Sequence, residues 1–251
     1  NNLFHNNNFP LINRVISGGY PSGSTIKPML ALAALQENII NPLKTINCPG
    51  YINLYNESGK IYWTFKDWSI HGTVNMIKAI AESCDVYFYT IGGGYGNQQG
   101  LGIDRIKNYL ELFGWGQKTG IDLPEEKTGL IPDEIWKKEN KNEKWYIGDT
   151  YNTSIGQGDV TISPLQLALA ISAIANNGTL YEPQLLQNSK PEIIRKISIK
   201  QEYFDIVKQG MRETIVSGSA TSLNNLSVHV AGKTGTAETF KNKTYAHSWF
   251  T

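Results

Sequence analysis

The sequence predicts a helix-rich α/β domain of the α+β type, and three observations support this prediction. The chain has 251 residues, of which 40% are hydrophobic and 18% charged, and this composition can bury a large core. Several segments carry apolar residues at helical spacing or consist of strong helix formers. A short β-rich segment near the end of the chain indicates a strand that follows these helices.

The first part of the chain predicts an irregular entry followed by a buried helix. Residues 1–20 are rich in turn formers, whereas residues 26–38 are almost all helix formers and are apolar on every side from 29 to 35. Pro28 fits only in the first turn of that helix, where backbone N–H groups have no intrahelical partner. The helix therefore places Ser24 at its N-terminus.

The middle of the chain predicts loops and then three helical segments. Residues 41–72 carry Pro, Gly, Asn and aromatic residues and are expected to form irregular loops. Residues 74–83 have a helical pattern, and the apolar pattern continues over 84–91 up to a glycine-rich turn. Residues 104–113 place apolar side chains on one face and predict a further helix.

The last part of the chain predicts a polar loop, two helices and a strand. Residues 124–150 have mixed charges and are expected to form a solvated surface loop. Ser163 and Pro164 suit the N-cap and first turn of a helix over residues 165–176. The remaining expected elements are a helix over residues 202–216 and a strand over residues 228–232 that leads into Lys233.

Composition and spacing argue against several classes of protein. The net charge of +1 does not indicate binding to nucleic acid or to an anionic membrane surface. Two cysteines exclude a disulfide framework, and neither they nor the four histidines have the spacing of a zinc motif, so no metal or cofactor is expected. No run of about 20 apolar residues could span a bilayer. Because the chain opens in Asn-rich sequence and stops at residues 249–251 without a closing element, we expect a fragment of a longer protein.

The string Ser24-Thr25-Ile26-Lys27 has the form S-x-x-K. Ser24 and Lys27 are three residues apart at the start of a helix and share one face. A serine hydroxyl becomes a nucleophile when a base accepts its proton, and a lysine can be that base when burial or a second cation favours its neutral form. Taken alone, the string also fits a capping serine beside a lysine whose head reaches solvent.

Ser83-Cys84-Asp85 lies between two apolar helices and has the form S-x-[ND]. The Ser83 hydroxyl could pass a proton to a leaving amine, and Asp85 could orient the local hydrogen bonds. On its own, this string also fits a turn or a cap, with Cys84 as a small packed residue.

Lys233-Thr234-Gly235-Thr236 follows the expected strand. Gly235 removes a side chain, so an extended substrate could lie against the strand edge. The charge of Lys233 and the hydroxyls of Thr234 and Thr236 suit a terminal carboxylate. The backbone N–H groups of Ser24 and Thr236 could form an oxyanion hole.

Together and in this order, the three strings form the set known from penicillin-binding proteins and class A β-lactamases. The chain resembles the transpeptidase domain of class B penicillin-binding proteins over nearly its whole length. Asp85 and the string Trp145-Tyr146-x-Gly148-Asp149-Thr150 resemble the elongation-type branch, penicillin-binding protein 2. Further matching strings are Pro10-Leu11-Ile12-Asn13-Arg14, Tyr20-Pro21-Ser22-Gly23-Ser24, Ile155-Gly156-Gln157-Gly158 and Ser163-Pro164-Leu165-Gln166.

This resemblance implies a peptidoglycan D,D-transpeptidase that acts during cell-wall elongation. Ser24 would attack the penultimate D-alanyl carbonyl of a stem peptide ending in D-Ala-D-Ala, and an amine of a neighbouring stem would then take the acyl group. Lys27 would be the base, while Ser83, supported by Asp85, would shuttle protons. β-Lactams would acylate Ser24. The substrate carboxylate would be held by Lys233, Thr234 and Thr236.

The resemblance also sets expectations for the whole protein. The fold would be that of the penicillin-binding transpeptidases and serine β-lactamases, with residues 1–251 forming a transpeptidase domain truncated at both ends. Its central antiparallel sheet would be incomplete and reduced to a lone strand, so the isolated fragment is expected to be inactive. A membrane anchor and a pedestal domain would lie outside this chain. The domain would face the periplasm at the inner membrane, with a glycan polymerase and a scaffold as partners.

Two other functions fit the same motifs. A serine β-lactamase would need a group that activates water for deacylation, and no such group can be identified in the sequence. A non-catalytic penicillin-recognising sensor would not need the intact nucleophile and lysines that are present here.

Overall fold

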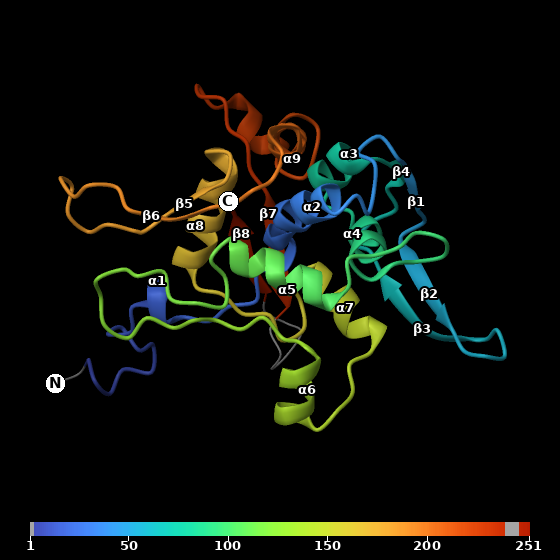
Figure 1. Cartoon of the computed structure of the whole chain (residues 1–251), viewed down its shortest axis with the longest axis horizontal. Coiled ribbons are helices and arrows are strands. Elements are labelled where there is room, and N and C mark those ends of the chain that lie inside the picture. Colours follow the sequence, from blue (N-terminus) through green and yellow to red (C-terminus); the bar gives the residue numbers. More distant parts are fainter. Residues whose placement is uncertain (1–2, 239–245) are drawn as a thin grey trace.

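The structure is a computed structural model that describes residues 3–238 and 246–251, and within them helices surround one central helix (Figure 1). Four two-stranded antiparallel sheets lie around these helices in the described part of the chain. The helices are α1 Arg14–Ser17, α2 Lys27–Gln36, α3 Met76–Ala81, α4 Asp85–Gly93, α5 Ile103–Leu112, α6 Glu134–Lys141, α7 Ile147–Ser154, α8 Pro164–Ala175 and α9 Gln201–Val216, with 3₁₀ turns η1 Gly23–Ile26 and η2 Thr221–Asn225. The strands are β1 Ile46–Cys48, β2 Tyr51–Tyr55, β3 Ile61–Lys66, β4 Gly72–Val74, β5 Thr179–Tyr181, β6 Ile193–Lys196, β7 Thr234–Glu238 and β8 Ala246–Phe250.

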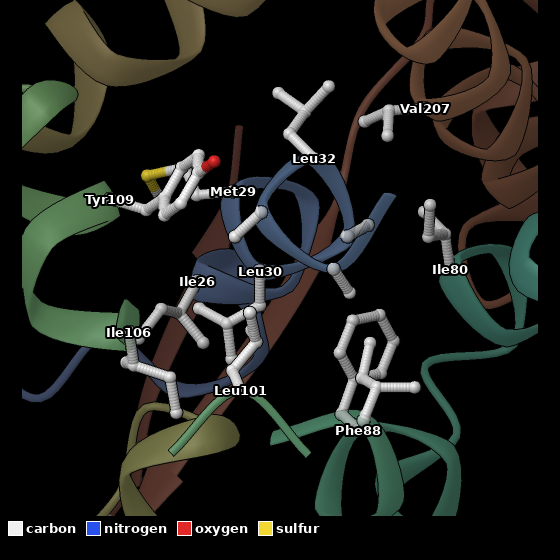
Figure 2. Packing of buried hydrophobic residues seen from close by; sticks show 14 of the residues in the cluster. Ile26, Met29, Leu30, Leu32, Ile80, Phe88, Leu101, Ile106, Tyr109 and Val207 are labelled. Carbon is white, nitrogen blue, oxygen red and sulfur yellow. The ribbon is translucent and has the colours of Figure 1, made fainter. Parts of the chain in front are cut away.

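The helix α2 is the centre of the core, as its uniformly apolar sequence predicts. Every residue from Lys27 to Leu35 is buried, and Pro28 lies in the first turn. Figure 2 shows α2 surrounded by side chains that include Ile80 of α3, Phe88 of α4 and Val207 of α9. Because α2 begins where η1 ends, the core fixes the position of the segment that contains Ser24.

The predicted helices over residues 74–83, 84–91, 104–113, 165–176 and 202–216 are confirmed as α3, α4, α5, α8 and α9. The start of α8 is also confirmed, because Ser163 and Gln166 form a reciprocal capping box around Pro164. Glu82 is the C-cap of α3 and Cys84 the N-cap of α4, so Ser83 lies in a turn between two largely buried helices.

Two predictions of irregular structure are wrong, and a third, the irregular entry, is right for most of the described residues. Residues 41–72 contain β1, β2 and β3, with β2 and β3 paired in a hairpin. Residues 124–150 contain α6 and the start of α7, where Asp133 caps α6 and Lys137 forms an ion pair with Asp149. The entry segment contains the short helix α1, while residues 1 and 2 lie outside the described residues.

The prediction of a lone strand is also wrong. Residues 228–232 are not a strand, because their backbone is tied to α9 through Gly232 N–H to Met211 O and Arg212 to Val230 O. The strand β7 starts at Thr234, and β8 pairs with it in antiparallel register. None of the helices in the described part of the chain is both long enough and apolar enough to cross a membrane.

Candidate active site

The three sequence motifs meet at one cavity of about 570 Å³ between η1, the α3–α4 turn and the sheet of β7 and β8. Residues of all three motifs line it, namely Ser24, Ser83, Asp85, Thr234, Gly235 and Thr236. The two lysines of the motifs, Lys27 and Lys233, are fully buried and do not line the cavity surface. The structure therefore brings together the residues that the sequence predicts, with both cations beneath the surface.

Lys27 is held by groups of the second motif. As the first residue of α2, it extends beneath the α3–α4 turn, where its Nζ donates to the Ser83 carbonyl at 2.8 Å and to the Ser83 hydroxyl at 3.2 Å. The same Nζ lies 2.5 Å from Asp85 Oδ1 and 5.3 Å from the centre of the Phe88 ring. Among the described residues no hydrogen bond joins the Ser24 hydroxyl to Lys27 Nζ, and Ser83 is the hydroxyl in direct contact with this amine.

Burial dominates the electrostatics of the other charged groups. Burial lowers the pKa of Lys233 well below its usual value, and the nearby Lys27 cation lowers it further. Burial also raises the pKa of Asp85, although the attraction of Lys27 opposes that shift. Burial therefore opposes the charged forms of Lys233 and Asp85.

The turn that contains Ser83 has an uncommon backbone conformation. Ser83 has φ +59°, in the left-handed region that residues with a side chain seldom adopt. Its carbonyl accepts hydrogen bonds from Lys27 and from the Trp68 indole at 3.3 Å. Such strain persists only where surrounding contacts hold the residue in place, and it often marks functional sites.

The register of β7 directs one backbone N–H group toward η1. Lys233 and Thr251 exchange both N–H···O bonds, and hydrogen-bonded pairs alternate with non-bonded pairs along an antiparallel ladder. Thr236 and Ser248 are therefore a non-bonded pair, and the Thr236 N–H points away from β8. The Thr236 carbonyl accepts a bond from Gln157 at 3.2 Å, as this orientation requires.

A close contact between η1 and β7 explains the glycine before Ser24. Gly23 has φ +53°, and a Cβ placed on it would lie 2.6 Å from the Thr236 carbonyl oxygen. The Gly23 N–H donates to Gly156 O at 2.9 Å, so the Ile155–Gly158 string supports this segment from behind. The N–H groups of Ser24 and Thr236 thus lie on neighbouring segments beside the same cavity.

Four residues of the cavity were not predicted from the sequence. Ser219 forms a 2.6 Å hydrogen bond between its hydroxyl and that of Thr234, which extends the row of hydroxyls along β7. Trp68, Ser248 and Trp249 complete the lining. Nothing local in the sequence marks these residues, because loops and a strand pairing bring them to the site.

A second group of reactive side chains lies behind the α3–α4 turn. Cys48, Asp67, His71 and Cys84 each offer one donor atom, and these four atoms lie within 4.8 Å of one another. The pairing of β1 with β4 places Cys48 opposite Gly72, next to His71. Cys84 brings the group directly against the turn between Ser83 and Asp85.

This donor set has the chemistry of a structural zinc site. Two sulfurs, one imidazole and one carboxylate supply four ligands of the types that tetrahedral Zn²⁺ takes, and a fully ligated ion has a structural role. His71 Nδ1 lies 2.9 Å from Glu82 Oε2, the kind of outer contact that orients a metal-binding imidazole. The expectation of no metal rested on local spacing, which does not test a group of four donors dispersed between residues 48 and 84.

This donor group is also linked to the α3–α4 turn by hydrogen bonds. Asp67 Oδ2 accepts the Val86 N–H at 2.8 Å and the Cys48 thiol at 3.3 Å. The hydrogen bond between the two thiols lowers the pKa of Cys48 to about 7 and, together with burial, raises that of Cys84. The group therefore connects β1 and the β3–β4 loop to the first turn of α4.

Comparison with known proteins gives matches along the whole chain. Residues 1–251 match the family described as the penicillin binding protein transpeptidase domain. The chain is 42% identical to the peptidoglycan D,D-transpeptidase MrdA of Acinetobacter baumannii over 91% of its length, and 33% identical to MrdA of Escherichia coli K12 over 97%. It spans 34% and 40% of the lengths of these two relatives.

Solved structures show the same fold. The complex between penicillin-binding protein 2 and MreC from Helicobacter pylori matches with a TM-score of 0.86 and 33% identity, covering 99% of this chain and 46% of that one. Penicillin-binding protein 2 of Pseudomonas aeruginosa in complex with WCK 5153 matches with a TM-score of 0.85 and 32% identity, covering 99% and 56%. The geometry of the three motifs and these matches agree, and the chain belongs to the family of penicillin-binding protein transpeptidase domains.

Proposed function

We propose that this chain is the catalytic part of a peptidoglycan D,D-transpeptidase of cell-wall elongation, with Ser24 as its nucleophile. The observation that carries the proposal is the convergence of three motifs on one cavity, with Lys27 bonded to Ser83 and Asp85 beneath it. The names of the MrdA relatives support the same activity.

In the first step, the Ser24 oxygen attacks the penultimate D-alanyl carbonyl of a stem peptide. Lys27 accepts the Ser24 proton, while the N–H groups of Ser24 and Thr236 stabilise the oxyanion. The Ser83 hydroxyl, 3.2 Å from Lys27 Nζ, passes that proton to the departing D-alanine amine. The carbonyl–nitrogen bond breaks, and an ester on Ser24 remains.

In the second step, the amine of a neighbouring stem attacks the ester. The same groups run in reverse, so Ser83 and Lys27 carry the proton of the attacking amine back to the Ser24 oxygen. A new amide forms and the ester bond breaks. Asp85, whose pKa is raised by burial, moderates the charge of Lys27 during both steps.

The substrate carboxylate is held mainly by hydroxyls. Thr234, Thr236 and Ser219 line the cavity, whereas Lys233 is fully buried and its Nζ donates to the Thr234 carbonyl at 2.9 Å. Lys233 therefore acts by positioning β7, and a β-lactam carboxylate uses the same hydroxyls.

For the whole protein, we propose a catalytic domain on the periplasmic face of the inner membrane, with the anchor and pedestal domain outside this chain. Two of the matching structures support the proposal that this protein binds other members of the elongation machinery. One is the complex with MreC, and the other is titled structural coordination of polymerization and crosslinking by a peptidoglycan synthase complex. A scaffold and a glycan polymerase are the partners that follow.

The test is covalent labelling of Ser24 with a fluorescent penicillin, followed by mass spectrometry. Wild type and the control Ser172→Ala, an exposed position on α8, are expected to carry one adduct, and Ser24→Ala none. Labelling of Ser24→Ala would contradict the nucleophile. Steady multiple turnover of nitrocefin would instead show a β-lactamase, and a stable adduct without cross-linking of stem peptides a sensor.

A further inference from the structure

Three adjoining cavities, together called the trench, lead from the cavity at Ser24 to the β2–β3 hairpin. The catalytic cavity shares Trp68 and Asp85 with a neighbouring cavity of about 590 Å³. That cavity shares Lys66, Tyr89 and Asn152 with a third one of about 600 Å³, formed between β3 and the start of α7. The trench is much larger than a terminal dipeptide requires, so it has room for a second, extended substrate.

The far end of the trench has exposed aromatic walls. Tyr62 and Trp63 of β3 are 58% and 60% exposed, and Tyr146, immediately before α7, is 62% exposed. Figure 1 shows the β2–β3 hairpin projecting from the body of the molecule beside α7. Single exposed aromatic side chains are common on protein surfaces, whereas several gathered around one groove indicate a binding surface.

These aromatic walls are held rigidly from behind. The Trp63 ring lies 6.3 Å from that of Phe65, which packs edge-on against the rings of Tyr89 at 5.7 Å and Tyr151 at 5.1 Å. The Lys137 ammonium lies 5.3 Å from the centre of the Tyr146 ring. Rings held in this way lose little conformational entropy when a ligand stacks on them.

The Trp145–Thr150 string builds this wall, although the catalytic steps do not use it. Tyr146 N–H donates to Asp149 Oδ2, which also binds Lys137 Nζ at 2.7 Å, so the charge of Asp149 is neutralised. A Cβ on Gly148 would lie 2.8 Å from Phe65, so this glycine lets α7 approach β3 closely. The result is a groove that is largely uncharged, aromatic and rimmed by a few polar groups.

We propose that this groove between β3 and α7 binds the glycan strand of peptidoglycan, as a carbohydrate-recognition surface for the acceptor strand. The C–H faces of pyranose rings are apolar and weakly positive and pack well on the negative faces of Trp and Tyr rings. The Lys66 ammonium and the Asn152 amide stand at the inner end of the groove, where sugar hydroxyl and acetamido groups can bond to them. The proposal rests on the proposed function, because it is the stems on such a strand that would reach Ser24.

A neutral polymer fits this groove better than a charged one. Lys66 is the cationic side chain among its lining residues, and Asp149 is paired with Lys137. The groove is also continuous with the catalytic cavity, so a strand lying in it would direct an attached stem along the trench. Aromatic stacking would thus select the glycan, and the inner trench would receive the stem.

The experiment measures binding of chitohexaose, a neutral oligomer of β-1,4-linked N-acetylglucosamine that serves as a probe for the glycan backbone, to the purified protein by titration calorimetry. Trp63→Ala and Tyr146→Ala are expected to weaken the Kd about tenfold each, the scale of a lost aromatic contact. Tyr181→Ala, an exposed aromatic position on β5 away from the groove, is the matched control and is expected to bind like wild type.

Labelling of Ser24 by fluorescent penicillin is measured on the same proteins. We expect all three variants to label at the wild-type rate, which shows that they are folded and separates this proposal from the proposed function. Equal chitohexaose binding by wild type and both groove variants, or no binding by the wild type, would each overturn the proposal. Loss of labelling in the wild type would instead refute the nucleophile.

Discussion

At the scale of single residues, the site consists of two fully buried lysines beside a half-buried serine, Ser24. The charge of Lys27 is compensated by an ion pair with Asp85 and by hydrogen bonds to both oxygens of Ser83. Lys233 Nζ instead donates to the neutral Thr234 carbonyl. A buried cation without an adjacent anion is costly. Lys233 is therefore a residue at which function opposes stability.

This conflict predicts a pH-dependent gain in stability for Lys233→Met. Because the folded-state pKa of Lys233 lies well below 10.5, the unfolded chain binds more protons between that lowered pKa and 10.5. The free energy of unfolding of the wild type therefore rises with pH between these two pKa values, by up to about 1.4 kcal/mol per pH unit. The variant is expected to be about 1–3 kcal/mol more stable at pH 7, with the difference narrowing toward pH 10. Urea unfolding at both pH values checks this, and a difference independent of pH would contradict it.

The cluster of Cys48, Asp67, His71 and Cys84 predicts zinc binding. Protein purified from zinc-containing medium is expected to hold about one Zn²⁺ per chain by elemental mass spectrometry, and a chelator should lower its melting temperature. Cys48→Ala should lose the metal, while His229→Ala, outside the cluster, should retain it. Equal zinc content in wild type and Cys48→Ala would rule the site out.

At the scale of secondary-structure elements, helices with clear apolar patterns and caps were predictable and short elements were not. Most of β3 is exposed, so it lacks the alternation that reveals a strand. The helix α6 is polar, and its cap at Asp133 lies within a run of charges. Residues 228–232 have a strand-like sequence, but their backbone bonds to α9 instead. In each case tertiary contacts outweighed local sequence.

The cap of α8 gives a quantitative test at this scale. Ser163→Ala removes the side-chain oxygen that accepts the Gln166 N–H, in a buried capping box. We expect a loss of about 1 kcal/mol in the free energy of unfolding, equivalent to roughly 2–4 °C in Tm for a domain of this size. Ser172→Ala on the exposed side of the same helix should change stability by less than about 0.5 kcal/mol. Similar losses in the two variants would show that the cap is not the cause.

At the scale of the whole molecule, the sequence predicted the residues of the catalytic cavity better than the fold around them. Ser24, Ser83 and Thr234 were assigned from ordered motifs, and the structure places them at one cavity. The cysteine, aspartate and histidine cluster was missed because it exists only after β1 pairs with β4 and the α3–α4 turn forms. A motif encodes chemistry locally, whereas a site assembled by topology leaves no local trace.

The position of α2 predicts that the domain unfolds as one unit. This helix packs against α3, α4, α5 and α9, so elements from distant parts of the chain share one core. Leu32→Ala, at a fully buried position, should cost about 2–5 kcal/mol and lower the urea midpoint measured by far-UV circular dichroism and by tryptophan fluorescence equally. Leu43→Ala, at a position that is 78% exposed, should leave both midpoints unchanged. If the two probes separated in Leu32→Ala, the elements on either side of α2 would be independent, and the nucleophile segment would depend on only one of them.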